Sequence, residues 1–343
     1  MKQAVLTGPK TIEVQETERP SAGPHEVVVK VEVCGICGSD LHMYGGNHPV
    51  LRPPLVMGHE FSGYITETGD GVKRFRTGDF VAVIPAVGCG VCEHCREGKF
   101  NLCRKREVIG GQHPGGLAEY AKVPEENLIL LPPNFTAVQG ALVECTAVAV
   151  HAVRKVGEIS GKSFAVFGAG PIGLLIAQTL KAFGARFVAV SDPIESRRML
   201  AVRLGADLAI DPIGENVEER IAGAECENGV DGAFDAAGLA QTLNQAMNVT
   251  KNGGSIVIVA MFGPKVDFAI QALQRTEKTL IGTQMYTRED FELGVRLLDG
   301  KRIRVEEMVT HRFPLERTSE AFRLIDARSR DAGKVIIDMN MRK

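Results

Sequence analysis

Tryptophan is absent from this chain of 343 residues, and aromatic side chains make up only 6% of it. The 40 lysines and arginines nearly balance the 42 aspartates and glutamates, and they form no long basic block. Nucleic acids and anionic membranes are bound by basic surfaces, and single strands also by stacked aromatic rings. The composition therefore argues against both kinds of partner.

The sequence also shows no sign of a leader or of a membrane span. The N-terminal MKQAVLTGPKTIEV has no apolar run of the signal-peptide type, so we expect a cytoplasmic protein with reduced thiols. The longest uncharged stretch, residues 163–180, contains GAGPIG, which divides it into a strand, a turn and the start of a helix. In a reducing compartment, we expect the eight cysteines to serve as metal ligands rather than to form disulfides.

Four cysteines fall within the segment GCGVCEHCREGKFNLC, residues 88–103, in a C-x2-C-x2-C-x7-C pattern: Cys89, Cys92, Cys95 and Cys103. Four thiolates suit one tetrahedral zinc ion with Zn–S bonds of about 2.3 Å. The alternatives are an iron–sulfur cluster, which usually has a shorter last gap followed by proline, and four unligated thiols. Four sulfurs leave no position for substrate, so the predicted zinc is structural.

The predicted pattern of secondary structure changes at about residue 146. Residues 1–130 contain short strand-like segments such as EVVVKVEV and FVAVIPAV, separated by glycine and proline turns. From residue 146 onward, strand-like runs alternate with helix-like runs, beginning with SFAVFGAG and PIGLLIAQTLKAFG. Such a βαβ series predicts a doubly wound parallel sheet. The tail after residue 286 contains two helix-like and two strand-like segments.

A glycine-rich motif follows the first strand of this series and opens an apolar helix. It matches G-x-G-x-x-G, and its residues are Gly168, Gly170, Pro171, Ile172 and Gly173. The first glycine makes a tight turn, the second lets the backbone approach a pyrophosphate, and the third lets the helix pack on the strand. The helix N-terminus then faces the phosphates. The motif predicts a dinucleotide site.

The cofactor is predicted to be NAD because an acidic residue stands about 20 residues beyond the last glycine. Asp192 closes the strand-like RFVAVSD, where its carboxylate can accept from both ribose hydroxyls and would repel a 2′-phosphate. Arg197 and Arg198 follow closely and weaken this inference, because arginine can hold a 2′-phosphate. The alternative role for Asp192 is to cap a helix N-terminus.

Further metal ligands lie outside the nucleotide segment, in VEVCGICGSDLH and in MGHEFSG. A catalytic zinc needs three protein ligands and one open position. Cys37, His59 and a carboxylate would provide the three. Two acidic residues are available for this role, Glu60 and Glu144.

A family resemblance rests on five stretches that occur in order: GICGSDLH, GHEFSGYI, the four-cysteine loop, an acid before the nucleotide segment, and GAGPIG. Over essentially its whole length, the chain resembles the zinc-dependent medium-chain dehydrogenases, and most closely the polyol group of sorbitol and 2,3-butanediol dehydrogenases. The resemblance implies an α/β protein in which a Rossmann domain with a doubly wound parallel sheet, residues 147–285, is inserted into a β-rich GroES-like catalytic domain. That domain comprises residues 1–146 and a C-terminal return, residues 286–343.

The resemblance also implies roles for individual residues. Zinc ligands are Cys37, His59 and Glu60, while Glu144 ligates directly or through a zinc-bound water. The remaining matches are the proton relay Ser39 and His42, the substrate-pocket residues Tyr44 and Tyr286, and the ribose-binding residues Asp192 and Arg197. The active site is expected in the cleft between the domains, and edge strands of the nucleotide domain are expected to meet across a homodimer or homotetramer.

Two departures from the polyol pattern bear on the substrate. Cys145 replaces the usual proline after Glu144, and Met285 replaces the arginine that precedes Tyr286 in sorbitol dehydrogenases. Without that guanidinium, a vicinal diol or hydroxyketone is favoured over a long polyol. Cys34 matches no ligand position and is expected to pack.

The predicted reaction interconverts a secondary alcohol and its ketone, with one catalytic and one structural zinc and hydride transfer to NAD. The alternatives are an L-threonine 3-dehydrogenase, a sugar-phosphate alcohol dehydrogenase and a non-catalytic NAD-binding protein.

Overall fold

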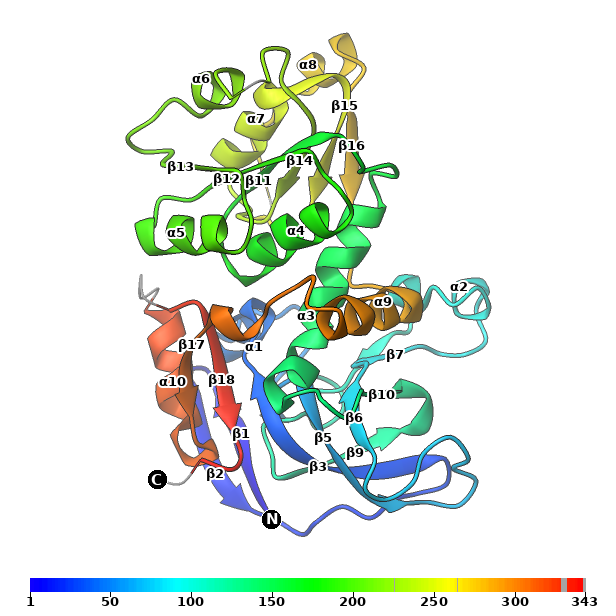
Figure 1. Ribbon diagram of the computed structural model, residues 1–343. Helices are drawn as coiled ribbons and strands as arrows, with labels where there is room; N and C mark the ends of the chain where they lie inside the picture. The colour runs from blue at the N-terminus through cyan, green and yellow to red at the C-terminus, as the bar shows by residue number, and fades with distance from the viewer. Residues whose placement is uncertain (225, 264, 328–331, 342–343) are drawn as a thin grey trace. The chain divides into compact units, whose positions relative to one another are not determined.

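The computed structural model describes residues 1–224, 226–263, 265–327 and 332–341 (Figure 1) and divides the chain into two compact units. The first unit comprises Met1–Glu144, Thr287–Asp299 and Val305–Lys343. The second comprises Cys145–Tyr286 and Gly300–Arg304. The sequence interpretation placed the boundaries at residues 146/147 and 285/286 and did not assign residues 300–304 to the nucleotide domain.

The first unit is built on β-sheets. Within the described residues, its largest sheet has seven strands in the order β10-β6-β5-β3-β18-β17, with β9 also pairing with β3. Smaller sheets have the orders β2-β1-β4 and β7-β8. The strand bounds are β1 Lys2–Gly8, β2 Thr11–Glu16, β3 Glu26–Gly35, β4 Leu55–Val56, β5 Glu60–Thr68, β6 Phe80–Val83, β7 Ala86–Val87, β8 Glu107–Val108, β9 Tyr120–Pro124, β10 Leu128–Leu130, β17 Val309–Phe313 and β18 Lys334–Asp338.

The last strand of the chain belongs to this sheet, because β18 lies between β3 and β17 (Figure 1). The valines of β3 at positions 27, 29 and 31 face a core that also contains Phe61 and Ile337. From Val29 to Val33 the buried valines alternate with Lys30 and Glu32, the pattern of a strand with one buried face, whereas Val28 is buried as well. The helices of this unit are α1 Gly38–Tyr44, α2 Glu93–Arg96, α9 Arg288–Asp299 and α10 Thr318–Asp326, with short 3₁₀ turns at Phe100–Leu102, Glu125–Asn127, Glu306–Met308 and Leu315–Arg317.

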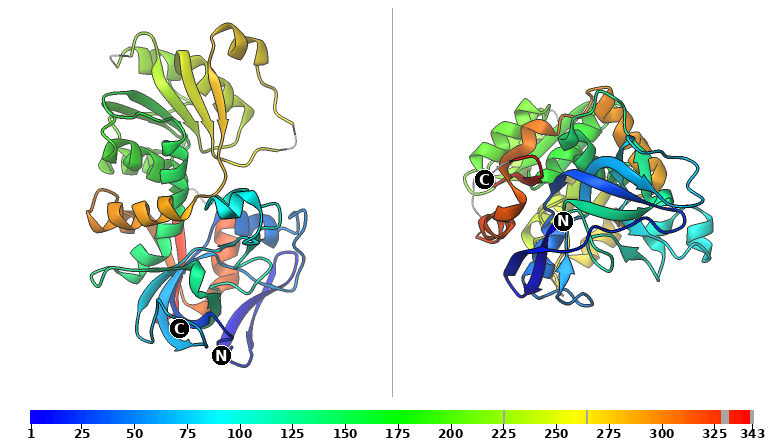
Figure 2. Two further views of the ribbon diagram at one scale, coloured as in Figure 1. Left: turned by 90° about the vertical axis from the view of Figure 1, so that its right-hand side faces the viewer. Right: turned by 90° about the horizontal axis from the view of Figure 1, so that it is seen from below.

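The second unit contains a parallel sheet of six strands among the described residues, in the order β13-β12-β11-β14-β15-β16. This is the strand order of a Rossmann fold, so the predicted fold class is confirmed. The left-hand view of Figure 2 shows these strands side by side. Their bounds are β11 Ser163–Phe167, β12 Phe187–Ser191, β13 Leu208–Ile210, β14 Val230–Asp235, β15 Thr250–Ile258 and β16 Thr279–Gly282.

Helices cover both faces of the parallel sheet, with α4 and α5 on one side and α6 and α7 on the other (Figure 1). Their bounds are α4 Pro171–Ala182, α5 Glu195–Arg203, α6 Val217–Ala222, α7 Ala240–Val249 and α8 Ile270–Arg275. One more helix, α3 Ala137–Arg154, contains the point at which the two units divide, and the sequence interpretation had not identified it. Among the described residues, none of these helices is both long and apolar enough to cross a bilayer.

Candidate metal centres and nucleotide site

The first cluster of metal-binding side chains lies where β3 ends and β5 begins. Cys37 directly precedes α1, His59 precedes β5, and Glu60 is the first residue of β5. The strand register pairs Gly35 with Glu60. A Cβ atom at Gly35 would lie 2.1 Å from Oε2 of Glu60, so only glycine leaves room for the carboxylate there.

Cys37, His59 and Glu60 each place one ligand atom so that all three atoms lie within 4.8 Å of one another. His59 is 9% exposed and Glu60 only 1% exposed, so the donors converge in a largely buried place. One thiolate, one imidazole and one carboxylate are zinc donors, and three of them leave a tetrahedral ion one further position. The residues therefore fit a catalytic zinc.

Asp40 holds the His59 ring and was missed by the sequence interpretation. Its fully buried carboxylate lies 3.2 Å from Nδ1 of His59 and also accepts the backbone N–H of Cys37 at 2.9 Å. Burial alone would lower the pKa of His59, but the negative charge of Asp40, with the Cys37 thiol, raises it well above the usual value. A carboxylate at one ring nitrogen leaves the other for metal. The available signal was the aspartate in GSDLH.

Lys334 is the second residue that the sequence interpretation missed. It begins β18, is 3% exposed, and its ammonium group forms an ion pair with Oε2 of Glu60. The same ammonium donates to the carbonyl of Ile36 at 3.1 Å. The only hint in the sequence was a lysine at the head of an otherwise apolar strand, KVIID.

The proposed relay residues lie along α1. Oγ of Ser39 is 3.4 Å from Nε2 of His59, which brings the hydroxyl to the metal cluster. His42 lies one turn further along the helix and is exposed. Tyr44 does not reach the cluster: its side chain is 1% exposed and its ring packs against Phe322 with the centroids 5.2 Å apart. This placement gives no support to a role for Tyr44 in binding substrate.

Other predicted residues lie near the division between the units. Glu144 is buried in α3 and is not among the three residues whose ligand atoms converge. Cys145, the next residue, is buried and belongs to the second unit, as does the fully buried Tyr286. Cys34 is fully buried and its thiol donates to the carbonyl of Gly35 at 3.5 Å, outside both metal clusters.

The four cysteines of the loop between β7 and β8 form the second metal cluster. Their sulfurs all lie within 4.8 Å of one another, on a segment that includes α2 and the 3₁₀ turn at Phe100–Leu102: Cys89, Cys92, Cys95 and Cys103. Gly90 and Gly98 have φ angles of 71° and 74°, in the left-handed region that glycine adopts without strain. A Cβ at Gly88 would lie 2.8 Å from the sulfur of Cys95. The loop is thus shaped for four converging sulfurs.

The pKa values of two of these thiols differ strongly from that of an ordinary cysteine. Hydrogen bonds from the backbone N–H groups of Val91 and Cys92 lower the pKa of Cys89 to about 6. Burial raises the pKa of Cys95 to about 12. Thiolates are the metal-binding form, so the four sulfurs would hold a metal ion only after the protonated thiols had released their protons.

The backbone of the glycine-rich turn has the geometry expected of a dinucleotide-binding site. Gly168 has a φ angle of 95°, and a Cβ at Gly173 would lie 1.8 Å from the carbonyl oxygen of Gly168. A Cβ at Gly170 would meet no atom within 4 Å, so this glycine faces open space. Pro171 is the first residue of α4, where its missing N–H costs nothing. Open space at the N-terminus of a 12-residue helix fits a pyrophosphate.

Asp192 stabilises the glycine-rich turn through hydrogen bonds. It is 4% exposed; one carboxylate oxygen accepts the N–H of Ala169 and the other that of Ile194, both at 2.8 Å. It therefore also closes the turn before α5, where Ile194 is the residue that precedes the helix. Arg198 is occupied, because its guanidinium donates to the carbonyl of Asp192 at 2.7 Å and pairs with Asp211 at 3.1 Å. Arg197 is half-buried on the same helix.

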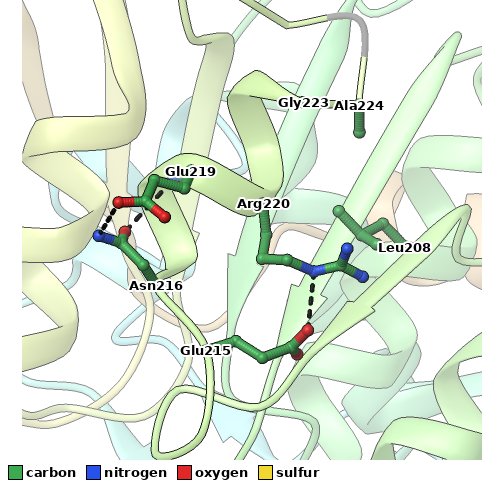
Figure 3. Close-up of a pocket in the computed structure, with 7 residues that line it drawn as sticks. All are labelled: Leu208, Glu215, Asn216, Glu219, Arg220, Gly223 and Ala224. Carbon is green, nitrogen blue, oxygen red and sulfur yellow. Dashed lines mark hydrogen bonds and ion pairs between the residues drawn. The ribbon is translucent and has the colours of Figure 1, made fainter.

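Two surface hollows lie apart from the Cys37, His59 and Glu60 cluster and from the glycine-rich turn. The larger, of about 340 Å³, lies beside α6 (Figure 3), where Arg220 pairs with Glu215 at 2.8 Å and Asn216 donates to Glu219 at 3.0 Å. The smaller, of about 220 Å³, lies under the four-cysteine loop and is lined partly by Arg74, Arg288 and Cys95. The charged groups of the larger hollow are satisfied by one another, which leaves it without a distinct ligand chemistry.

Two known domain families match this chain, one in its N-terminal part and one in its nucleotide-binding part. Residues 23–133 match the alcohol dehydrogenase GroES-like domain, and residues 171–300 match the zinc-binding dehydrogenase domain. The L-galactonate-5-dehydrogenase of Escherichia coli is 34% identical over 94% of each chain. The L-threonine 3-dehydrogenase of Pyrococcus furiosus is 35% identical over 94% of each chain.

The same similarity extends to solved structures. The crystal structure of 2R,3R-butanediol dehydrogenase from Bacillus subtilis superposes with a TM-score of 0.91 at 34% identity, covering 99% of each chain. The named activities of these three proteins differ in substrate, while all three are dehydrogenases.

Proposed function

This chain belongs to the zinc-dependent medium-chain alcohol and polyol dehydrogenases, and we propose that it interconverts a vicinal diol, or a similar short secondary alcohol, with its ketone. The observation that carries the proposal is the convergence of Cys37, His59 and Glu60 within 4.8 Å. The family's cofactors are zinc and a nicotinamide dinucleotide. When bound, they supply a Lewis acid that acidifies the substrate hydroxyl and an acceptor for the hydride.

The protein's own residues hold the metal and move the proton. Cys37, His59 and Glu60 are the proposed ligands, with Glu144 as an outer partner rather than a member of the converging set. Asp40 keeps the ring of His59 in place through Nδ1. Ser39 would accept the substrate proton at Oγ as its own hydroxyl proton leaves toward the exposed His42 and on to water. Imidazole suits this step because its two ring nitrogens can accept a proton on one side and release one on the other.

The choice of substrate rests on the residue before Tyr286. Met285 offers no charge for the distal hydroxyls of a long polyol, which favours a short diol such as the substrate in the name of the Bacillus subtilis relative. L-Threonine is the second candidate, because the threonine dehydrogenase of Pyrococcus furiosus has 35% identity over nearly the whole chain. A sugar-phosphate alcohol is a third.

A substrate screen tests this proposal. Zinc-loaded protein is assayed with NAD and 2,3-butanediols, sorbitol, xylitol, L-threonine and galactitol 1-phosphate, and kcat/KM is compared. The highest value is expected for a butanediol. A highest value for threonine or for the phosphorylated polyol would replace the proposed substrate, and absence of turnover with every secondary alcohol at verified zinc content would favour a non-catalytic NAD-binding protein.

NAD is the proposed cofactor rather than NADP. The Asp192 carboxylate lies beside the glycine-rich turn, and Arg198 is held by Asp211 and so is not available to a 2′-phosphate. Asp192→Ala should raise the ratio of NADP to NAD binding by about tenfold, a difference of about 1.4 kcal/mol. Titration of nucleotide binding in metal-loaded protein measures this. An unchanged ratio would mean that Asp192 serves only to close the turn.

A homodimer or homotetramer in the cytoplasm is the proposed working form. Within the described residues, β16 is the last strand on its side of the parallel sheet, so its outer backbone groups are available to a second copy. The four closely spaced thiols of the loop suit a reducing compartment. Light scattering of the zinc-loaded protein gives the oligomeric state, and a monomer at all concentrations would contradict this proposal.

A further inference from the structure

Asp235 is a fully buried carboxylate that belongs to neither metal cluster. It is the last residue of β14, which pairs with β11 and β15 through Phe167 and Ile258. The direction in which successive strands are added to the sheet reverses between β11 and β14. Dinucleotides bind outside the carboxyl ends of the strands at such a reversal. Asp235 therefore lies at the edge of the sheet where the cofactor is expected.

The Asp235 side chain closes the turn that follows β14. One carboxylate oxygen accepts the backbone N–H groups of Ala237 and Gly238, at 2.9 and 2.8 Å. The other accepts the hydroxyl of Thr242, in the first turn of α7, at 2.8 Å. Burial raises the pKa of the Asp235 carboxyl above its ordinary value, so its negative charge costs stability at neutral pH. What these hydrogen bonds provide is one fixed conformation of the turn.

The turn of residues 236–238 packs against the glycine-rich turn. A Cβ at Gly168 would lie 3.2 Å from the backbone nitrogen of Ala237, and a Cβ at Gly173 would lie 3.5 Å from Cβ of Ala236. Ala237 is itself exposed. The turn is thus a second surface of the nucleotide site, directly beside the one that the glycines form.

The same turn also contacts the loop after β15. The main-chain carbonyl of Asp235 accepts the N–H groups of Val259 and Ala260, both at 3.0 Å. Gly238 has a φ angle of 74°, and a Cβ there would lie 2.7 Å from the carbonyl oxygen of Met261. Asp235 therefore connects the carboxyl ends of three neighbouring strands, β11, β14 and β15.

We propose that Asp235 is a positioning residue for the dinucleotide, because it holds the turn of residues 236–238 in the conformation that forms one wall of the cofactor site. It acts through the backbone of that turn and through Thr242, without touching the cofactor. If the wall were not preformed, the apparent Kd would rise in inverse proportion to the fraction of molecules that have it in place. The inference concerns cofactor binding alone and does not depend on which alcohol is the substrate.

Titration of NAD binding to the metal-loaded protein tests this inference. Asp235→Ala leaves two N–H groups and one hydroxyl without their acceptor, so the Kd for NAD should rise by about tenfold or more. In Asp235→Asn, the amide oxygen can accept the same N–H groups and the amide nitrogen can donate to Thr242. That variant should bind NAD within about threefold of the unchanged protein.

Asp231→Ala is the matched control, because Asp231 lies near the opposite end of the same strand. Its carboxylate also accepts a backbone N–H and a hydroxyl, both from Ser163, at 2.8 and 2.9 Å. Both alanine variants should have a lower melting temperature, since each loses hydrogen bonds of the same kind. Only Asp235→Ala should bind NAD more weakly.

Equal affinity for NAD in the two alanine variants, measured below both melting temperatures, would overturn the inference, because a purely structural carboxylate predicts that result. A loss in Asp235→Asn as large as in Asp235→Ala would also overturn it, since the charge and not the hydrogen bonds would then decide binding. If Asp235→Ala does not fold, Thr242→Val and its control Thr242→Ser replace it: only the valine should weaken binding, by about threefold, and equal affinities would contradict the proposal. Failure of the unchanged protein to bind NAD would refute the nucleotide site itself.

Discussion

The two metal clusters of the first unit are built in opposite ways. The four sulfurs of the loop come from one segment of 15 residues, Cys89–Cys103, and depend only on that segment's own turns. The three converging side chains of the Cys37, His59 and Glu60 cluster come from the start of α1 and the start of β5. Their supporting groups are Asp40 and, from the far end of the chain, Lys334. A metal site with four protein ligands can be built from one short segment. A site that leaves one coordination position free needs further residues that orient its three ligands without occupying that position.

The strongest way to separate the two clusters is Cys37→Ser. Turnover should fall by roughly 1,000-fold or more, because the metal that stabilises the developing charge is lost or misplaced. NAD binding should stay the same, since the glycine-rich turn belongs to the second unit. Steady-state kinetics and nucleotide titration measure the two effects.

The matched control for that change is Cys34→Ser, which alters a buried thiol outside both clusters. It should keep its metal and most of its activity. Normal turnover by Cys37→Ser at verified metal content would show that Cys37 is not a ligand of the catalytic ion.

The reverse result is expected at the loop. Cys95→Ser removes one of four sulfurs, so its structural ion should bind weakly and the melting temperature should fall by roughly 10 °C. Folded protein below that temperature should keep nearly full kcat. Differential scanning calorimetry with kinetics at low temperature tests this, and loss of the chemical step in stable protein would mean that the loop does more than fasten the chain.

Asp40→Asn sharpens the comparison at the level of supporting residues. The asparagine can still accept the Cys37 N–H, but it loses the charge that holds Nδ1 of His59. Affinity for the catalytic ion should fall by about 10- to 100-fold, while the loop ion is unaffected. Competition with a graded series of chelators distinguishes the two ions, and equal weakening of both would argue for a general loss of structure.

The smallest effect concerns the order in which the loop thiols react once zinc is removed. With a pKa of about 6, Cys89 is mostly thiolate at pH 7, whereas Cys95, with a pKa of about 12, stays protonated. Chelator-treated protein should therefore be alkylated first at Cys89, as mass spectrometry of peptides can show. At pH 5 this preference should shrink, because Cys89 then becomes protonated. Early labelling of Cys95 would contradict the hydrogen bonding described for the loop.

The difference between a site made from one segment and a site made from distant segments also explains which features could be predicted from the sequence. The loop was recognisable because its spacing alone brings four sulfurs together, and the Rossmann unit because GAGPIG followed a strand and preceded a helix. Cys37, His59 and Glu60 were found in separate motifs, and only the register of β3 and β5 brings them together. Asp40 and Lys334 were missed because each is recognised only by the side chain it pairs with, His59 and Glu60, and Lys334 lies far beyond Glu60 in the sequence.

Tyr44 was assigned to the substrate pocket by family resemblance alone. Its ring packs against Phe322 of α10, a contact that the sequence does not indicate, and its role in the pocket stays a prediction. Similarly, α3 went unrecognised because its sequence, AVQGALVECTAVAVHAVR, is apolar nearly all round and lacks a single polar stripe.

The place of β18 between β3 and β17 also determines when this protein can take shape on the ribosome. Residues 145–286 form most of the second unit from one continuous stretch, so that unit can fold while the chain is still being made. The first unit, although its synthesis begins earlier, lacks a central strand of its largest sheet until residue 338 has emerged. A premature stop before residue 338 would therefore shorten or remove β18 and take support from the part of the protein that was translated first.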